Sequence, residues 1–155
     1  MVVEVVRSAQ VPAPIDQVWA VVSDPERAPD WFSFADRTEV LSGEGVGQRR
    51  RQFGRWGRFR SEIDQEVTAF EPPTLIAWKH TKERIDGRDS PTYAKSTRFR
   101  IELAADGEHT TVSLRTVQEP TNLVRGVLMR LVGTKEIKRR MDESLARLAR
   151  AVVSG

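Results

Sequence analysis

The chain has 155 residues, which is the size of one domain. Residues 1–155 are therefore expected to form a single domain. It contains no cysteine, which excludes disulfides, thiolate catalysis and cysteine-ligated metal centres. The net charge is only +3, from 25 basic and 22 acidic residues that are interspersed, which predicts a mixed-charge surface.

Residues 2–11 alternate between apolar and polar side chains and predict a strand. This start lacks the apolar core of a signal peptide, and no apolar run approaches the ~20 residues of a membrane span. A cytoplasmic location is therefore expected. Residues 12–32 predict an amphipathic helix and then an elbow, because the helical apolar period is followed by Pro25 and Pro29.

Segments separated by glycine and proline turns predict six further strands. Their expected ranges are 37–41, 46–53, 58–70, 75–81, 92–103 and 110–119. Residues 82–91 are charged and contain glycine, so they are expected to form a mobile hairpin tip. Short turns between consecutive strands predict antiparallel pairing.

Residues 122–152 change to the helical period and predict a long C-terminal helix, kinked near Gly133 and Thr134. Its first part, residues 123–132, is apolar nearly all round, which favours burial; the alternative is a cavity gate or a transient membrane contact. The whole pattern predicts an α+β fold, with a curved antiparallel sheet of about seven strands wrapped around the C-terminal helix. A concave space of this kind commonly holds a small molecule.

Six segments are distinctive in their order and spacing. They are APIDQVWAVVSDPERAPDW, GEGVGQ, FEPPTLIAW, the strand pair RFRIEL and TTVSLR, and KEIKRRMDESLARLARAV. Together they resemble the helix-grip, START-like superfamily, also called SRPBCC, and within it the bacterial polyketide cyclase/dehydrase and lipid-transport branch. The resemblance covers nearly the whole chain. It implies a hydrophobic cavity between sheet and C-terminal helix, used for ligand binding, lipid transfer or ring-closing and dehydration chemistry, and it carries over no catalytic residue.

Strand alternation places Ile76, Trp78 and His80 on one face of their strand, and Tyr93 on the same face as Phe99. These faces, the elbow and the C-terminal helix supply the residues expected to contact a ligand. They are Trp31, Phe53, Ile76, Trp78, His80, Tyr93, Thr97, Phe99, Leu114, Leu128, Leu131, Ile137 and Met141.

His80 and Tyr93 are the candidate acid/base residues, because an imidazole that titrates near neutrality can pass protons in an enolisation, aldol closure or dehydration. The alternative for His80 is a histidine that faces solvent. His109 lies beside a predicted turn and is expected at the surface. No cofactor and no histidine-rich metal centre are expected, while carboxylate ligands for a metal stay open.

Six arginines between positions 49 and 60 interleave with aromatic residues, as in binders of single-stranded nucleic acid. Alternation splits this run between two faces, with Arg50 opposite to Arg49 and Arg51, and acidic residues follow closely, so no specific nucleic acid is expected. One inward arginine would instead meet an acidic group of a ligand, because a guanidinium pairs well with carboxylate or phosphate.

The leading prediction is a monomer or homodimer that binds a hydrophobic small molecule, lipid-like or aromatic and polyketide-like. The second is a cofactor-independent cyclase, aromatase or dehydrase that acts on a ligand in the same cavity. The third is an interaction module that acts through its basic surface. The sequence leaves open which ligand is bound and whether any reaction is catalysed.

Overall fold

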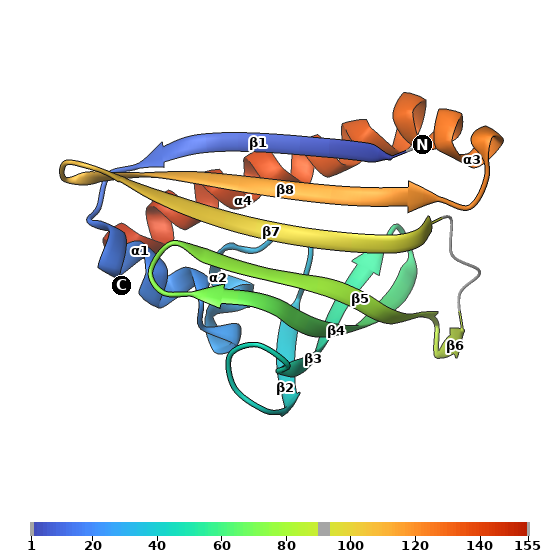
Figure 1. Cartoon of the computed structure of the whole chain (residues 1–155), viewed down its shortest axis with the longest axis horizontal. Helices are drawn as coiled ribbons and strands as arrows, with labels where there is room; N and C mark the ends of the chain where they lie inside the picture. The colour runs from blue at the N-terminus through green and yellow to red at the C-terminus, as the bar shows by residue number, and fades with distance from the viewer. Residues whose placement is uncertain (1, 90–93, 155) are drawn as a thin grey trace.

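The computed structural model describes residues 2–89 and 94–154. In this part of the chain, eight strands form one antiparallel sheet in the order β1-β8-β7-β5-β4-β3-β2, with β6 paired to β5 (Figure 1). The strands are β1 (Val3–Val11), β2 (Arg37–Ser42), β3 (Arg49–Trp56), β4 (Phe59–Glu71), β5 (Leu75–Ile85), β6 (Arg88–Asp89), β7 (Ala94–Asp106) and β8 (His109–Pro120). Consecutive strands joined by short turns are neighbours, as antiparallel pairing requires.

The helices lie on one face of this sheet. They are α1 (Ile15–Val22), a 3₁₀ turn (Pro25–Arg27), α2 (Ala28–Trp31), α3 (Leu123–Leu128), a π-helical turn (Met129–Gly133) and α4 (Thr134–Ser154). α4 runs along the sheet beside β1 and β8, and α1 lies near its C-terminal end (Figure 1). This arrangement confirms the predicted α+β helix-grip fold. We call the sheet face toward the helices the inner face.

The core lies between the inner face and α4. Residues of β1 alternate as predicted, so Val5 and Val11 are buried while Glu4 is exposed. On α4, Met141, Leu145 and Leu148 recur every three to four residues on one helical face and are at most 4% exposed. The apolar stripe of the helix therefore covers the apolar row of the sheet, which is the main hydrophobic contribution to stability.

Several strands are longer than expected. β5 continues to Ile85 because the turn that ends it is formed by Asp86, with a φ of 51°, and Gly87, with a φ of 79°. The Asp86 carboxylate also accepts a hydrogen bond from the Arg60 backbone N–H across the sheet, at 2.9 Å. The expected interruption of the C-terminal helix near Gly133 coincides with the π-helical turn.

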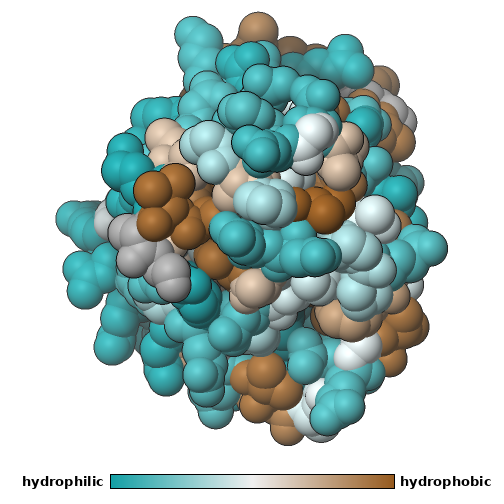
Figure 2. All heavy atoms as spheres, turned by 90° about the vertical axis from the view of Figure 1, so that its left-hand side faces the viewer, coloured by the Kyte–Doolittle hydropathy of each residue, from teal (hydrophilic) through white to brown (hydrophobic). Residues whose placement is uncertain are grey.

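The expected burial of residues 123–132 is wrong. Six apolar side chains there are 49–72% exposed, and we call them the α3 patch: Leu123, Val124, Val127, Leu128, Leu131 and Val132. α3 lies at the end of the molecule where β1 begins and β8 ends, beyond most of the sheet that would cover it (Figure 1). The opposite end is mainly hydrophilic, with apolar residues in separate patches (Figure 2).

Among the described helices, none combines the length and apolar character needed to cross a bilayer.

Candidate ligand-binding site

The predicted faces of β5 and β7 meet on the inner face of the sheet. Trp78 pairs with Phe99, and Ile76 pairs with Ile101, across the two strands. Directly paired residues of antiparallel strands point to the same side, so these four side chains form a continuous apolar surface. All four are at most 5% exposed.

Five aromatic side chains gather on this surface: Trp31, Phe32, Phe34, Trp78 and Phe99. Trp78 and Phe99 are stacked, with ring centroids 5.0 Å apart. Phe32 meets the Phe99 ring edge to face at 5.3 Å. Phe32 and Phe34 were not among the predicted site residues, because they end the elbow or follow it, where no helical or strand period assigns a side chain to a face.

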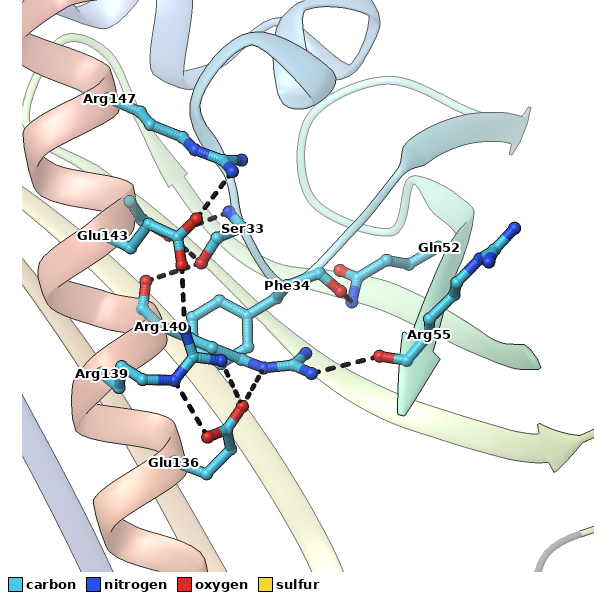
Figure 3. Close-up of polar contacts among 10 residues, drawn as sticks. Ser33, Phe34, Gln52, Arg55, Glu136, Arg139, Arg140, Glu143 and Arg147 are labelled. Atoms are coloured by element: carbon cyan, nitrogen blue, oxygen red, sulfur yellow. Dashed lines mark hydrogen bonds and ion pairs between the residues drawn. The ribbon is translucent and has the colours of Figure 1, made fainter. Parts of the chain in front are cut away.

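Two polar contacts fix the elbow between these aromatic residues and α4 (Figure 3). The Ser33 backbone N–H donates to the Ser144 hydroxyl at 2.9 Å, and the Ser33 hydroxyl donates to the Arg140 carbonyl at 2.7 Å. Ser144 is fully buried, so this contact satisfies a polar group that would otherwise be costly to bury. The elbow is thereby held at a fixed position along the helix.

The elbow also lies close to β3. The Gln52 amide donates to the Phe34 carbonyl at 3.4 Å (Figure 3). A Cβ atom added to Gly54 would lie 2.8 Å from the same carbonyl oxygen, closer than real Cβ contacts allow. Glycine at this position therefore permits the close backbone approach that places Phe34 in the aromatic cluster.

Charged residues of α4 form a second link to β3. Arg140 donates to the backbone carbonyl of Arg55 at 3.1 Å, as Figure 3 shows. The Glu136 carboxylate accepts hydrogen bonds from Arg139 at 2.6 Å and from Arg140 at 3.0 Å. These two guanidinium groups lower the pKa of Glu136 to about 2. Glu136 therefore stays ionised at neutral pH and orients Arg140 toward β3.

Polar residues continue the inner face beyond the aromatic cluster, and we call Arg50, Gln52 and Gln65 the Arg50 cluster. All three are at most 6% exposed. The Gln65 amide donates to the Gln52 side-chain oxygen at 2.8 Å. The Arg50 guanidinium carbon lies 4.8 Å from the centroid of the Trp78 ring, within the range of a cation–π contact.

Arg50 differs from its two neighbours in the chain. Arg49 and Arg51 point to the outer face, where Arg49 lies 3.8 Å from Glu66 and Arg51 lies 2.7 Å from Asp64. Alternation splits the three arginines between two faces, as predicted, and the structure shows that Arg50 is the one that points inward. No hydrogen bond or ion pair joins Arg50 to any residue that the structure describes, and burial lowers its pKa to about 10.

The outer-face pairs are extended by Arg84, which donates to Asp64 at 2.8 Å. Hydrogen bonds from Arg51 and Arg84 hold the pKa of Asp64 well below its usual range. Ion pairing of Arg51 and Arg84 therefore uses carboxylates on the outer side of β4, away from Arg50.

Four buried side-chain atoms have no hydrogen-bond partner among the described residues: Arg50 Nε, Gln65 Oε1, Trp78 Nε1 and Thr116 Oγ1. The four residues belong to the inner face, since Arg50 pairs with Gln65, Trp78 with Phe99, and Phe99 with Thr116. Most buried polar groups in folded proteins find a partner, so four on one face require an explanation.

Of the two candidate acid/base residues, the structure describes His80. His80 pairs with Gln65 in the strand register and so lies on the inner face, with its side chain 16% exposed. The alternative of a fully solvent-facing histidine is therefore excluded. Its Nδ1 lies 3.0 Å from the Glu83 carboxylate. Tyr93 lies outside the described residues.

Other predicted site residues divide between the core and the surface. Leu114 and Met141 are fully buried, Ile137 packs on the core, and Thr97 is half-buried on the face of Phe99. They border the same interior as the aromatic cluster.

Three residues that were predicted to contact the ligand lie away from the inner face. Phe53 lies on the outer face with Arg51, beneath the Arg37 guanidinium at 3.9 Å, because the inner positions of β3 are the polar ones. Leu128 and Leu131 are 51% and 65% exposed in the α3 patch, where they border solvent.

A shallow depression of about 330 Å³ lies on the outer face of β5, β7 and β8. Its charged residues include Arg100 and Glu102, which already pair with each other at 3.0 Å. It therefore offers a ligand little unsatisfied charge, and the inner face remains the candidate site.

Solved structures share this architecture. The Zhui aromatase/cyclase from Streptomyces sp. R1128 superposes with a TM-score of 0.78 at 18% identity, over 98% of this chain and 94% of that one. TTHA0849 from Thermus thermophilus gives 0.77 at 19% identity over 98% of both chains. Ara h 8.0201 gives 0.74 at 14% identity over 100% of both chains. At such identities these likenesses show the fold alone. Among curated proteins, none matches this sequence.

The family assignment comes from the sequence match. Residues 2–153 match the family described as polyketide cyclase / dehydrase and lipid transport. The match spans nearly all of the chain, and the observed helix-grip fold agrees with the resemblance seen in the sequence. The chain belongs to the polyketide cyclase/dehydrase and lipid transport family of helix-grip proteins.

Proposed function

We propose that this protein binds a hydrophobic small molecule, a lipid or an aromatic polyketide-like compound, between the inner face of the sheet and α4. The observation that carries the proposal is the meeting of the aromatic cluster with buried polar atoms that lack partners among the described residues. Ligand sites are mostly apolar with a few placed polar groups, and this face has that composition. Membership of the family supports the same class of ligand.

The first test is native mass spectrometry of freshly purified protein, followed by organic extraction and a thermal-shift screen of fatty acids, sterols and aromatic polyketides. A bound compound stabilises the folded state by an amount that grows with the logarithm of its concentration relative to Kd, so Tm rises with concentration. Trp78→Phe removes the indole from the site, and Trp19→Phe on α1 is the matched control. We expect weaker binding for the first variant alone. No adduct and no shift with any compound would contradict the proposal.

The α3 patch suggests how a lipid would reach this interior. Exposed contiguous apolar surface commonly marks an interaction site, and an amphipathic helix can rest in a membrane interface. We therefore propose transient membrane contact through α3. Flotation with phosphatidylcholine vesicles, with and without phosphatidylserine, tests this. Leu131→Ser is expected to reduce flotation, whereas Val40→Ser, at an exposed position of β2, leaves it unchanged. Protein that does not float with either vesicle contradicts the contact.

A second candidate function is cyclisation or dehydration of the bound molecule, favoured by the position of His80. A carboxylate on one imidazole nitrogen fixes the tautomer and leaves the other nitrogen to accept a proton. With Glu83 against Nδ1, His80 Nε2 would remove a proton next to a ketone and return it to a departing hydroxyl as water leaves. Tyr93 remains the proposed acid partner. This chemistry needs no cofactor.

The enzyme proposal is tested on a linear poly-β-ketone made by a minimal polyketide synthase, with cyclised product as the readout. His80→Gln is expected to reduce turnover about 100-fold, the usual scale of acid/base catalysis. His109→Gln, at an exposed hairpin, is the matched control. Unchanged turnover for His80→Gln and Tyr93→Phe together would remove these catalytic roles and leave binding intact.

Little supports an interaction module that acts through its basic surface. Arg49, Arg51 and Arg55 each face an acidic side chain, at distances of 2.7–3.9 Å. Binding that weakens steeply with salt would be the sign of such a module.

A further inference from the structure

The position of Arg50 narrows the class of ligand. This side chain is 5% exposed and pairs with Gln65 of β4. The two acidic residues that flank Gln65, Asp64 and Glu66, point to the outer face and pair with other cations. Its inner-face neighbours Gln52 and Gln65 are neutral amides that hydrogen-bond to each other. The described part of the fold thus buries one guanidinium without supplying an anion for it.

A buried charge without a counter-ion is costly, and proteins usually pair it. The Trp78 ring at 4.8 Å offsets part of this cost through a cation–π contact. The ring does not satisfy the N–H groups, and Arg50 Nε remains without an acceptor among the described residues. Burial lowers the pKa of Arg50 to about 10, so the side chain still carries its charge at neutral pH. Arg50 is therefore a buried cation that has no anionic partner among the described residues.

The shape of the donors suits an oxyanion such as a carboxylate. A guanidinium edge presents two parallel N–H groups and matches the two oxygens of a carboxylate. Trp78 Nε1 adds another donor on the same face that has no partner in the described ranges. Beyond these donors lie the stacked Trp78 and Phe99 rings, which favour an apolar body. A ligand with an anionic end and an apolar body therefore suits this face.

We propose that the ligand is a hydrophobic carboxylic acid whose carboxylate pairs with Arg50 while its apolar body covers the aromatic cluster. This inference rests on the proposed binding function and specifies the polar end of the ligand. Arg50 would act as a binding and orienting residue, because pairing with the carboxylate would fix which end of the ligand lies at β3. Neither Arg49 nor Arg51 can replace it, since both point to the opposite face.

The experiment compares acids with neutral molecules of the same shape. Decanoate is paired with decanol, and naphthoate with naphthalenemethanol, and each is titrated into the full chain by calorimetry at neutral pH. A charge-assisted contact is expected to give at least one acid about tenfold tighter binding than its alcohol. Arg50→Gln is expected to remove this preference, and Arg49→Gln, which loses the same charge from the outer face, is expected to keep it.

Each outcome bears on one proposal. Equal affinity for acid and alcohol overturns the role of Arg50 but is compatible with the binding function. If neither compound binds and the earlier screen finds no adduct, the binding function itself is wrong.

If Arg50→Gln fails to fold, nitrogen-15 arginine spectra of the unaltered protein test the role of Arg50 instead. The Nε–H resonance of Arg50 must shift with acid and stay in place with alcohol. A shift caused equally by chloride alone would show an adventitious ion only and overturn the proposal.

Discussion

The Arg50 guanidinium lies over the indole ring of Trp78, with 4.8 Å between its central carbon and the ring centroid. The two residues come from β3 and β5, which are separated by β4, so the contact crosses a strand. It joins the polar and the aromatic halves of the inner face. Because Trp78 also stacks on Phe99, a change at Arg50 reaches the centre of the aromatic cluster.

Arg50→Met is expected to leave the free energy of unfolding unchanged or raise it by about 1 kcal/mol, because the apolar side chain of similar length removes an unpaired buried charge. Urea unfolding followed by circular dichroism measures this. Arg49→Met is the control and should change stability by less than about 0.5 kcal/mol, since Arg49 is exposed. A loss greater than about 1 kcal/mol for Arg50→Met would mean that its contacts stabilise the fold.

Asp64→Asn is expected to lower the free energy of unfolding by about 2 kcal/mol at neutral pH, because Asp64 is largely buried and accepts hydrogen bonds from Arg51 and Arg84. Its pKa is lower in the folded protein, so its stabilisation is complete above the unfolded-state value of about 4. The contribution is lost as pH falls toward the folded-state pKa.

The difference between wild type and Asp64→Asn should therefore shrink in unfolding curves below about pH 4. Asp36→Asn is the comparison, because Asp36 is 70% exposed and lies 3.9 Å from Arg55. It should cost less than about 0.5 kcal/mol at any pH. A loss for Asp64→Asn that does not depend on pH would point to packing instead of charge.

Gly54→Ala is expected to destabilise the protein by about 1–3 kcal/mol, because the new methyl group would meet the Phe34 carbonyl at 2.8 Å. The elbow must then move away from β3, which also displaces Phe34 from Phe99. Thermal unfolding and tryptophan fluorescence report both effects. Ser61→Ala, directly opposite on β4, should leave the fluorescence spectrum unchanged.

Ser144→Ala is expected to cost about 1–2 kcal/mol, because the Ser33 backbone N–H loses its acceptor in a partly buried position. Denaturant unfolding measures the loss, and hydrogen exchange of the Ser33 amide should become faster. Ser8→Ala on β1 removes a hydroxyl contact of 2.7 Å that is exposed to water and should cost much less. Equal losses for the two variants would show that burial of the contact is unimportant.

Regular elements of this chain could be assigned from their period. Alternation correctly placed Trp78, His80 and Phe99 on one face, because a strand places every second residue on the same side. The faces of β3 were harder to assign from hydropathy, because polar Arg50 and Gln52 point inward while apolar Phe53 points outward. Hydropathy therefore assigned Phe53 to the wrong face.

The remaining errors have other physical causes. Phe32 and Phe34 lie in an irregular segment, so only tertiary contacts reveal that they complete the aromatic cluster. The apolar composition of α3 favoured burial, but burial also requires a covering element, and the sheet ends before most of α3. The cytoplasmic location and the oligomeric state stay predictions.

The π-helical turn at Met129–Gly133 affects the direction in which α3 faces. Such a turn holds one residue more than an α-helical turn, and one residue corresponds to about 100° of rotation around a helix axis. α3 is therefore rotated relative to the position that an unbroken extension of α4 would give it. Deleting a single residue from this turn would swing a different side of α3 outward. The orientation of the apolar surface thus depends on the number of residues in one turn as well as on their chemistry.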